Sequence, residues 1–333
     1  MQSYQPRLNS KTHQSRQCAK IMLLIGLFAL STIFAVPARF SGDNNGVVLA
    51  QTALTGEWTA KVYDGKTGNR DEQEKDPKEW NEANKQDSIQ INLTRRSNKG
   101  ENNFGSSIPY ADFEGLTRDV ALDTNPNITF RLKREAGTID FQGSFQAGRG
   151  AGGFTFAPNQ NFINAMRSRG FAEMTEEQMF ASTTLNVTTK AVDDLRGAGF
   201  KLTLDDVFKA VIFKITPQFI AEMNSIGFKN LDMEDLVKAR IFKITPEFSR
   251  EVASLGFGNQ PMESLVKMRI FKITPQFISE TRAAGFENLG IEELVKFRIF
   301  KIDAEFIQRA RANGYTGNDP EEFVRLKIHG MGK

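Results

Sequence analysis

The sequence predicts an α+β fold, in which a small antiparallel β domain at residues 56–156 precedes an all-α repeat domain at residues 157–333. Two patterns support this division. In the first region, apolar and polar residues alternate over several short segments, which is typical of half-buried strands. In the second, a glycine followed by an aromatic residue recurs at intervals of 29, 28, 29, 29 and 29 residues. Such a period indicates an α-solenoid of six helix-turn-helix repeats of about 29 residues each.

Residues 1–38 are predicted to form a signal peptide or a signal anchor. They carry four basic residues and no acidic ones, and residues 21–38 are uncharged and largely apolar. This uncharged run is at the lower length limit for spanning a bilayer, so cleavage and retention as a membrane tether both stay open. Either outcome predicts an extracytoplasmic protein that is periplasmic, secreted or anchored facing outward. Residues 39–55 are expected to form a linker.

Composition excludes several classes of function. The net charge of +3 becomes −1 once residues 1–38 are removed, so no global positive field would attract nucleic acid. The only cysteine is Cys18, and the chain after residue 38 holds one histidine, His329, which we interpret as a terminal packing residue. Cys/His zinc sites, Ser-His-Asp triads and thiol nucleophiles are therefore not expected, and no cofactor is predicted. The protein is predicted not to be an enzyme.

The β domain is expected to be a small antiparallel sheet or half-barrel of five or six strands. The predicted strands are residues 56–63, 88–94, 127–133, 138–145 and 153–156. Glu135-Ala-Gly137 is predicted to be a hairpin turn. Residues 65–86 are crowded with charged side chains and are expected to form an exposed loop. The glycine-rich run at 148–153 follows no buried parallel strand, which favours a hairpin turn over a phosphate-binding loop.

The helix ends of each repeat can be located from capping residues. The first helix should begin after a threonine or aspartate, often followed by proline, and end at the glycine of the repeat. Its predicted N-caps are Thr188, Thr216, Thr245, Thr274 and Asp303. Those of the second helix are Thr175, Thr203, Asp232, Pro261, Gly290 and Asp319, of which the proline and the glycine cap less well.

Two columns of apolar residues in the second helix are expected to be buried between repeats. One column is Val207, Leu236, Leu265, Leu294 and Phe323. The other is Ile212, Ile241, Ile270, Ile299 and Ile328. A single pair of short helices cannot bury both faces, so each repeat is expected to cover the next.

The candidate binding surface is a basic and aromatic run at the end of the second helix. Lys-x-Arg-Ile-Phe-Lys-Ile occurs at 238–244, 267–273 and 296–302. Stacking would align a basic ladder of Lys238, Arg240, Lys243, Lys267, Arg269, Lys272, Lys296, Arg298 and Lys301. Such a ladder would suit a protein or an anionic envelope component. The structural alternative is that the bases complement helix C-termini while the phenylalanines are core, since residues 157–333 hold 24 bases and 23 acids.

Three stretches, at residues 103–117, 134–145 and 148–158, lead directly into the helical repeats. Together they resemble the extracytoplasmic C-terminal region of some bacterial membrane proteins related to the beta-lactam-sensing antirepressor metalloproteases. The repeats of that region are similar to residues 268–277 and 326–331 here. The resemblance covers most of residues 103–331 and implies a bacterial, envelope-located recognition or scaffolding module. Because the chain has no His-Glu-x-x-His motif and no multi-span bundle, neither peptidase activity nor drug sensing carries over.

These observations predict a non-catalytic interaction or scaffold protein of the cell envelope, with envelope sensing as one setting. One alternative is a small-ligand-binding β domain, because the Gly56-x-Trp58 opening is similar to the start of a lipocalin. Another is a carboxylate-based hydrolase that uses acidic pairs on the second helices. The recurrence of those pairs in the first helical turn favours a capping role instead.

Overall fold

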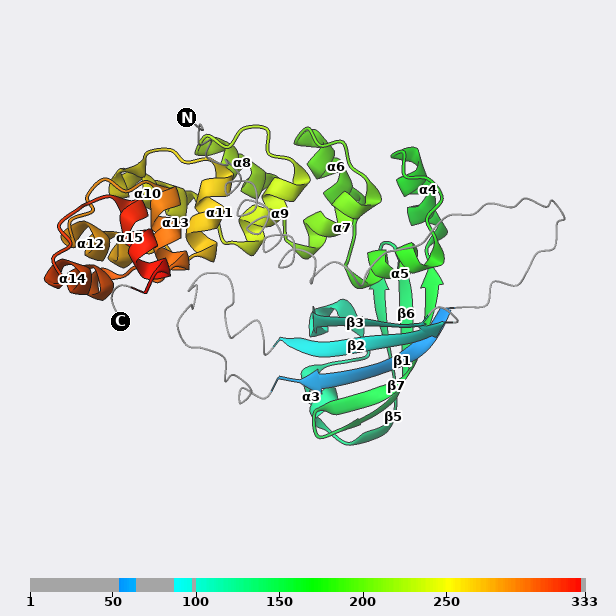
Figure 1. The fold of residues 1–333 in the computed structure, drawn as a ribbon. Helices are drawn as coiled ribbons and strands as arrows, with labels where there is room; N and C mark the ends of the chain where they lie inside the picture. Colours follow the sequence, from blue (N-terminus) through cyan, green and yellow to red (C-terminus); the bar gives the residue numbers. More distant parts are fainter. Residues whose placement is uncertain (1–53, 64–86, 98–99, 331–333) are drawn as a thin grey trace, which may run out of the picture. The chain divides into compact units, whose positions relative to one another are not determined.

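The computed structural model describes residues 54–63, 87–97 and 100–330. Within these ranges the fold is α+β, as predicted, and comprises a curled antiparallel sheet of seven strands and thirteen α-helices (Figure 1). The predicted signal segment, the linker up to residue 53 and the whole of the predicted loop at 65–86 lie outside the described residues.

The seven strands form one sheet in the order β3-β2-β1-β7-β6-β5-β4, and each neighbouring pair is antiparallel. The strands are β1 (Leu54–Val62), β2 (Ser88–Ser97), β3 (Gly100–Pro109), β4 (Phe113–Glu114), β5 (Asn125–Arg134), β6 (Gly137–Gln146) and β7 (Arg149–Pro158). All five predicted strands are present, and the Glu135–Gly137 turn joins β5 to β6. Strands β3 and β4 were not predicted. Strand β3 lies at the edge of the sheet and is largely polar, so it lacks the alternation that reveals a half-buried strand.

An aromatic cluster around Trp58 forms the centre of the sheet's core. The Trp58 side chain is 1% exposed, and its ring meets Phe130 and Phe141 edge-on, with centroids 5.1 and 6.1 Å apart. Its indole N–H donates to the backbone oxygen of Gln142 at 3.1 Å. A buried indole needs such an acceptor, because its polar N–H has no access to water.

The glycine-rich run at 148–153 does more than form the predicted turn. Gly148 has a φ of +79° at the turn between β6 and β7, but Gly150 and Gly152 lie within β7 itself. A Cβ atom on Gly150 would lie 2.7 Å from the Trp58 ring, and one on Gly152 would lie 2.0 Å from the Gln142 oxygen. The prediction of a hairpin turn was therefore incomplete. Gly150 and Gly152 have no side chain that would collide with the indole or with the neighbouring strand.

Twelve of the helices follow the sheet as six consecutive pairs (Figure 1). Helix α3 (Arg118–Leu122) lies earlier, between β4 and β5. The first helices of the pairs are α4 (Gln160–Ser168), α6 (Thr189–Gly197), α8 (Pro217–Ser225), α10 (Pro246–Val252), α12 (Pro275–Ala283) and α14 (Ala304–Ala312). The second helices are α5 (Glu176–Thr184), α7 (Leu204–Ile212), α9 (Met233–Ile241), α11 (Met262–Ile270), α13 (Ile291–Ile299) and α15 (Pro320–Ile328). Among the second helices, α7, α9, α11, α13 and α15 are successive neighbours in space.

The predicted helix caps are present. Each predicted threonine or aspartate N-cap accepts a hydrogen bond from a backbone N–H of the first turn, whereas Pro261 and Gly290 provide no side-chain cap. The glycine after each first helix has a φ between +77° and +97°. That left-handed conformation is open to glycine at little cost, which explains why the glycine recurs.

Of the two predicted core columns, one is confirmed and the other is wrong. The column containing Leu236 and Leu265 is 0–2% exposed. The isoleucine column is largely at the surface, since four of its five members are 44–58% exposed: Ile212, Ile241, Ile299 and Ile328. The helix ends directly after each of these isoleucines, so no further turn covers them. The core position is taken instead by the isoleucine three residues later, such as Ile244, which is 0% exposed.

The sheet and the first helices share one apolar core. Phe162 of α4, Met179 of α5, Val192 of α6 and Val207 of α7 are buried in the same cluster as Trp58. A second cluster begins at Leu195 and continues to the last helix. The sheet gives way to helices between Pro158 and Gln160, and the apolar core continues across that change. In the described part of the chain, no helix combines the length and apolar character needed to cross a membrane.

Candidate functional site

The nine residues of the predicted basic ladder separate into three columns with different contacts. The first column is Lys238, Lys267 and Lys296, in the last turns of α9, α11 and α13. The second is Arg240, Arg269 and Arg298, two residues further along the same helices. The third is Lys243, Lys272 and Lys301, two residues beyond the helix ends. The structure therefore does not make one uniform basic surface from these residues.

The first column is neutralised by carboxylates. Lys267 Nζ lies 2.8 Å from Glu292 of the next second helix, and this hydrogen bond raises the pKa of Lys267. Lys296 pairs in the same way with Glu321, whereas Lys238 Nζ lies 3.0 Å from Asp235 on its own helix. These cations compensate acids of the helical array, so an external ligand would have to displace existing partners.

The second column connects successive helix pairs. Each guanidinium lies 3.8 Å from the ring centroid of a phenylalanine on the first helix of its own pair. Each also donates to a backbone oxygen of the preceding pair. For example, Arg298 stacks on Phe277 and donates to the Lys272 oxygen at 2.8 Å. Burial lowers the pKa of Arg298. The stack stabilises the packing of the two helices within a pair, and the hydrogen bond ties that pair to the preceding one. For this column, the contacts favour a role in stabilising the fold over a role in binding a ligand.

The third column is held in a left-handed backbone conformation, with φ values of +51° at Lys243, +52° at Lys272 and +54° at Lys301. This conformation costs a non-glycine residue roughly 1–2 kcal/mol. The Ile244 N–H donates to the Ala239 oxygen at 2.8 Å, which completes a Schellman turn around Lys243. At the same position, the first pair has Asn186 and the last has Gly330, the residue types that adopt this conformation most readily.

The side chains of the third column are exposed. Within the described residues, the ammonium groups of Lys243, Lys272 and Lys301 take part in no ion pair or hydrogen bond. Two residues before the first and last of these lysines are the exposed isoleucines Ile241 and Ile299. We call the set Ile241, Lys243, Lys272, Ile299 and Lys301 the corner surface. It combines exposed apolar and unpaired cationic side chains at the ends of three neighbouring helices.

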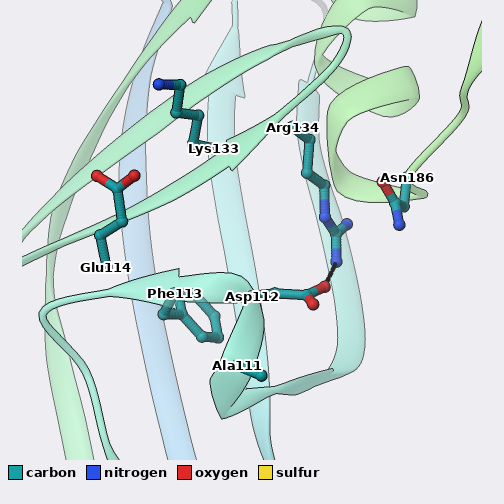
Figure 2. A pocket seen from close by; sticks show the side chains of 7 residues that line it. All are labelled: Ala111, Asp112, Phe113, Glu114, Lys133, Arg134 and Asn186. Carbon is teal, nitrogen blue, oxygen red and sulfur yellow. Dashed lines mark hydrogen bonds and ion pairs between the residues drawn. The ribbon is translucent and has the colours of Figure 1, made fainter.

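A separate open depression of about 410 Å³ lies where the sheet meets the turn after α5 (Figure 2). Its lining residues are Ala111, Asp112, Phe113, Glu114, Lys133, Arg134 and Asn186. The Arg134 guanidinium is 2.7 Å from Asp112 and also donates to the Thr183 and Thr184 oxygens at the end of α5. The main cation of this depression thus satisfies a helix C-terminus.

The structure also shows the surroundings of His329 and of the acidic pairs in the second helices. His329 is exposed at the C-cap of α15, where the helix ends, so its predicted packing role is wrong. Several members of the acidic pairs form ion pairs, as Glu292 does with Lys267, and Asp206 acts as a cap by accepting the Thr203 N–H at 2.8 Å. Among the described residues, no group of three or more histidine, cysteine, aspartate or glutamate side chains could hold a metal ion.

Sequence reasoning missed two features of this region. The arginine contacts between pairs leave no mark in the sequence beyond the recurrence of arginine and phenylalanine. The left-handed lysines could have been found from Asn186 and Gly330, which stand in the same column at the two ends of the array. No family model, no curated protein and no solved structure matches this chain.

Proposed function

We propose that the protein is a non-catalytic binding protein of the cell envelope, and that its helices form an α-solenoid of six repeats that presents the corner surface to a partner. The regular caps, the shared core column and the recurring arginine contacts support the solenoid. In such an array the same surface group recurs once per repeat, which suits an elongated partner. The proposed location outside the cytoplasm, with or without a membrane tether, is supported by the composition of residues 1–38 alone.

The main support for this proposal is the difference in contacts among the three columns of the basic ladder. Two of its three columns are engaged in ion pairs or in contacts between helix pairs, and Lys243, Lys272 and Lys301 are exposed without ionic partners among the described residues. Exposed isoleucines beside them add apolar contact area. A protein or an anionic envelope component would complement both features.

The packed aromatic core of the sheet is relevant to the alternative that the β domain binds a small ligand. The buried face around Trp58 is occupied by packed phenylalanines, so a ligand there would have to displace them. Members of the acidic pairs, which the hydrolase alternative would need, already have partners, as Asp206 does at a helix cap and Glu292 does in an ion pair. Neither alternative is favoured by a specific contact.

The test is binding of the purified protein to immobilised poly-glutamate and to phosphatidylglycerol vesicles. The variant replaces Lys243, Lys272 and Lys301 with glycine, which suits their backbone conformation. The matched control replaces three exposed lysines elsewhere, Lys133, Lys201 and Lys229, with glutamine, and so removes the same charge. The proposal predicts salt-sensitive binding that the first variant loses and the control keeps. Equal loss in both variants, or no binding to either polyanion, would contradict it.

A further inference from the structure

We propose that the corner surface binds an extended acidic segment of a partner protein in a polyproline II conformation, with one carboxylate beside each lysine of the third column. The inference rests on the proposed function, because it names the partner of that same surface. It follows from the charge, the spacing and the rigidity of the column.

Charge selects an acidic ligand that also carries apolar residues. Lys243, Lys272 and Lys301 have no ionic partner within the described residues, so three positive charges in a row are left uncompensated. Ile241 and Ile299 are 47% and 44% exposed, and they lie two residues before a lysine of the column. A segment that alternates carboxylates with apolar side chains would pair the lysines and cover the isoleucines.

Spacing selects the conformation of that segment. The three lysines follow α9, α11 and α13, which are successive neighbours, and packed helices have axes about 8–10 Å apart. A polyproline II chain has three residues per turn and rises about 3.1 Å per residue, so one face recurs every ~9 Å. A β-strand returns to the same face after about 6.6 Å, and an α-helix after about 5.4 Å. Of these three shortest repeats, that of polyproline II is nearest to the spacing of one side chain per helix pair.

The backbone under the column is fixed before any ligand arrives. Lys272 is enclosed by a Schellman turn, in which the Ile273 N–H donates to the Met268 oxygen at 2.8 Å. Its carbonyl oxygen also accepts from Arg298 of the next pair. Lys243 has the corresponding contacts with Ile244 and Arg269. A preorganised backbone reduces the ordering that binding requires, so a repeated weak contact can add up along the column.

The experiment compares three synthetic peptides that each carry four glutamates, at intervals of two, three or four residues. Their sequences repeat Glu-Leu, Glu-Pro-Leu or Glu-Pro-Pro-Leu, and binding to the purified protein is measured by fluorescence anisotropy. The Glu-Pro-Leu peptide should bind at least tenfold more tightly than the other two. Replacing Lys243, Lys272 and Lys301 with glycine should weaken its binding at least tenfold, because the three positive charges are lost. The variant should keep its fold, since Gly330 has the same left-handed conformation at the equivalent position. The glutamine control at Lys133, Lys201 and Lys229 should stay within twofold.

Two results would overturn the inference in distinguishable ways. Equal affinity for all three spacings, together with corner-dependent binding of poly-glutamate or phosphatidylglycerol vesicles, would remove the extended acidic segment but leave the proposed function in place. If the glycine variant and the wild type bind every polyanion equally, the inference and the proposed function both fail.

A second variant, with Ile241 and Ile299 changed to serine, should bind the Glu-Pro-Leu peptide threefold or more weakly. An unchanged affinity would remove the apolar part of the inference.

Discussion

The sheet and the helical array are stabilised in different ways. The sheet depends on one cluster that occurs once, in which Trp58 packs among phenylalanines over glycines that leave room for the indole. The helical array repeats the same contacts from pair to pair, as the arginine–phenylalanine stacks at 3.8 Å illustrate. A change in the sheet therefore removes something that has no copy elsewhere. A change in the array weakens one of several equivalent contacts. Substitutions in the sheet and in the array can therefore test this difference.

The largest expected effect is at the centre of the sheet. Replacing Trp58 with alanine should lower the free energy of unfolding by about 3–5 kcal/mol, because the ring is 1% exposed and the surrounding rings cannot close the cavity. Urea titration followed by circular dichroism measures this loss, and Trp58→Phe should lose less. A change below about 1 kcal/mol would show that the cluster is not the main support of the sheet.

Leu265 tests the core of the array. Leu265→Ala should cost about 2–5 kcal/mol, since this side chain is fully buried between neighbouring second helices. Hydrogen exchange should show faster opening of α9, α11 and α13, with smaller changes in the sheet strands. Unchanged thermal unfolding would contradict the assignment of this column to the core.

The arginine contacts should have an intermediate effect. Replacing Arg298 with methionine keeps much of the side-chain length but removes both the stack on Phe277 and the hydrogen bond to the Lys272 oxygen. We expect a loss of about 1–3 kcal/mol, measured by thermal unfolding. Arg298→Lys should recover part of it. If methionine is as stable as arginine, the contacts between pairs come from apolar packing alone.

The smallest effect should have the opposite sign. Lys272→Gly should stabilise the protein by about 0.5–1 kcal/mol, because glycine adopts the left-handed conformation at φ +52° without steric cost. Lys229→Gly is the matched control, since Lys229 is exposed and does not have a positive φ. It should be neutral or slightly destabilising in the same calorimetric scan. A destabilising Lys272→Gly would mean that the lysine side chain contributes to the fold.

Much of the fold could be predicted because its signals are local. The caps at Thr216 and Thr274 and the glycine turns are set by backbone chemistry within a few residues. The exposure of Ile241 could not be predicted in this way. Its sequence period suggests a core position, but whether the helix continues past it depends on the turn at Lys243. Likewise, the polar edge strand β3 is held by its pairing with β2, which a single-strand pattern does not reveal.

The candidate site was predicted only as a set of residues. The sequence placed nine bases in one ladder, but it could not separate Arg269, which stacks on Phe248, from Lys272, which has no ionic partner among the described residues. That separation depends on contacts between residues far apart in the sequence, such as Arg269 and the Lys243 oxygen. It also depends on backbone angles that the residue types alone do not predict.

The central claim is that one column of the ladder binds while another holds the helices together. Two triple variants test it in parallel: Lys243, Lys272 and Lys301 to glycine, and Arg240, Arg269 and Arg298 to methionine. Each is measured for melting temperature and for affinity to poly-glutamate. We predict that the glycine variant keeps or raises the melting temperature and loses affinity, whereas the methionine variant melts several degrees lower. A glycine variant that melts lower, or that binds as tightly as the unchanged protein, would contradict the account.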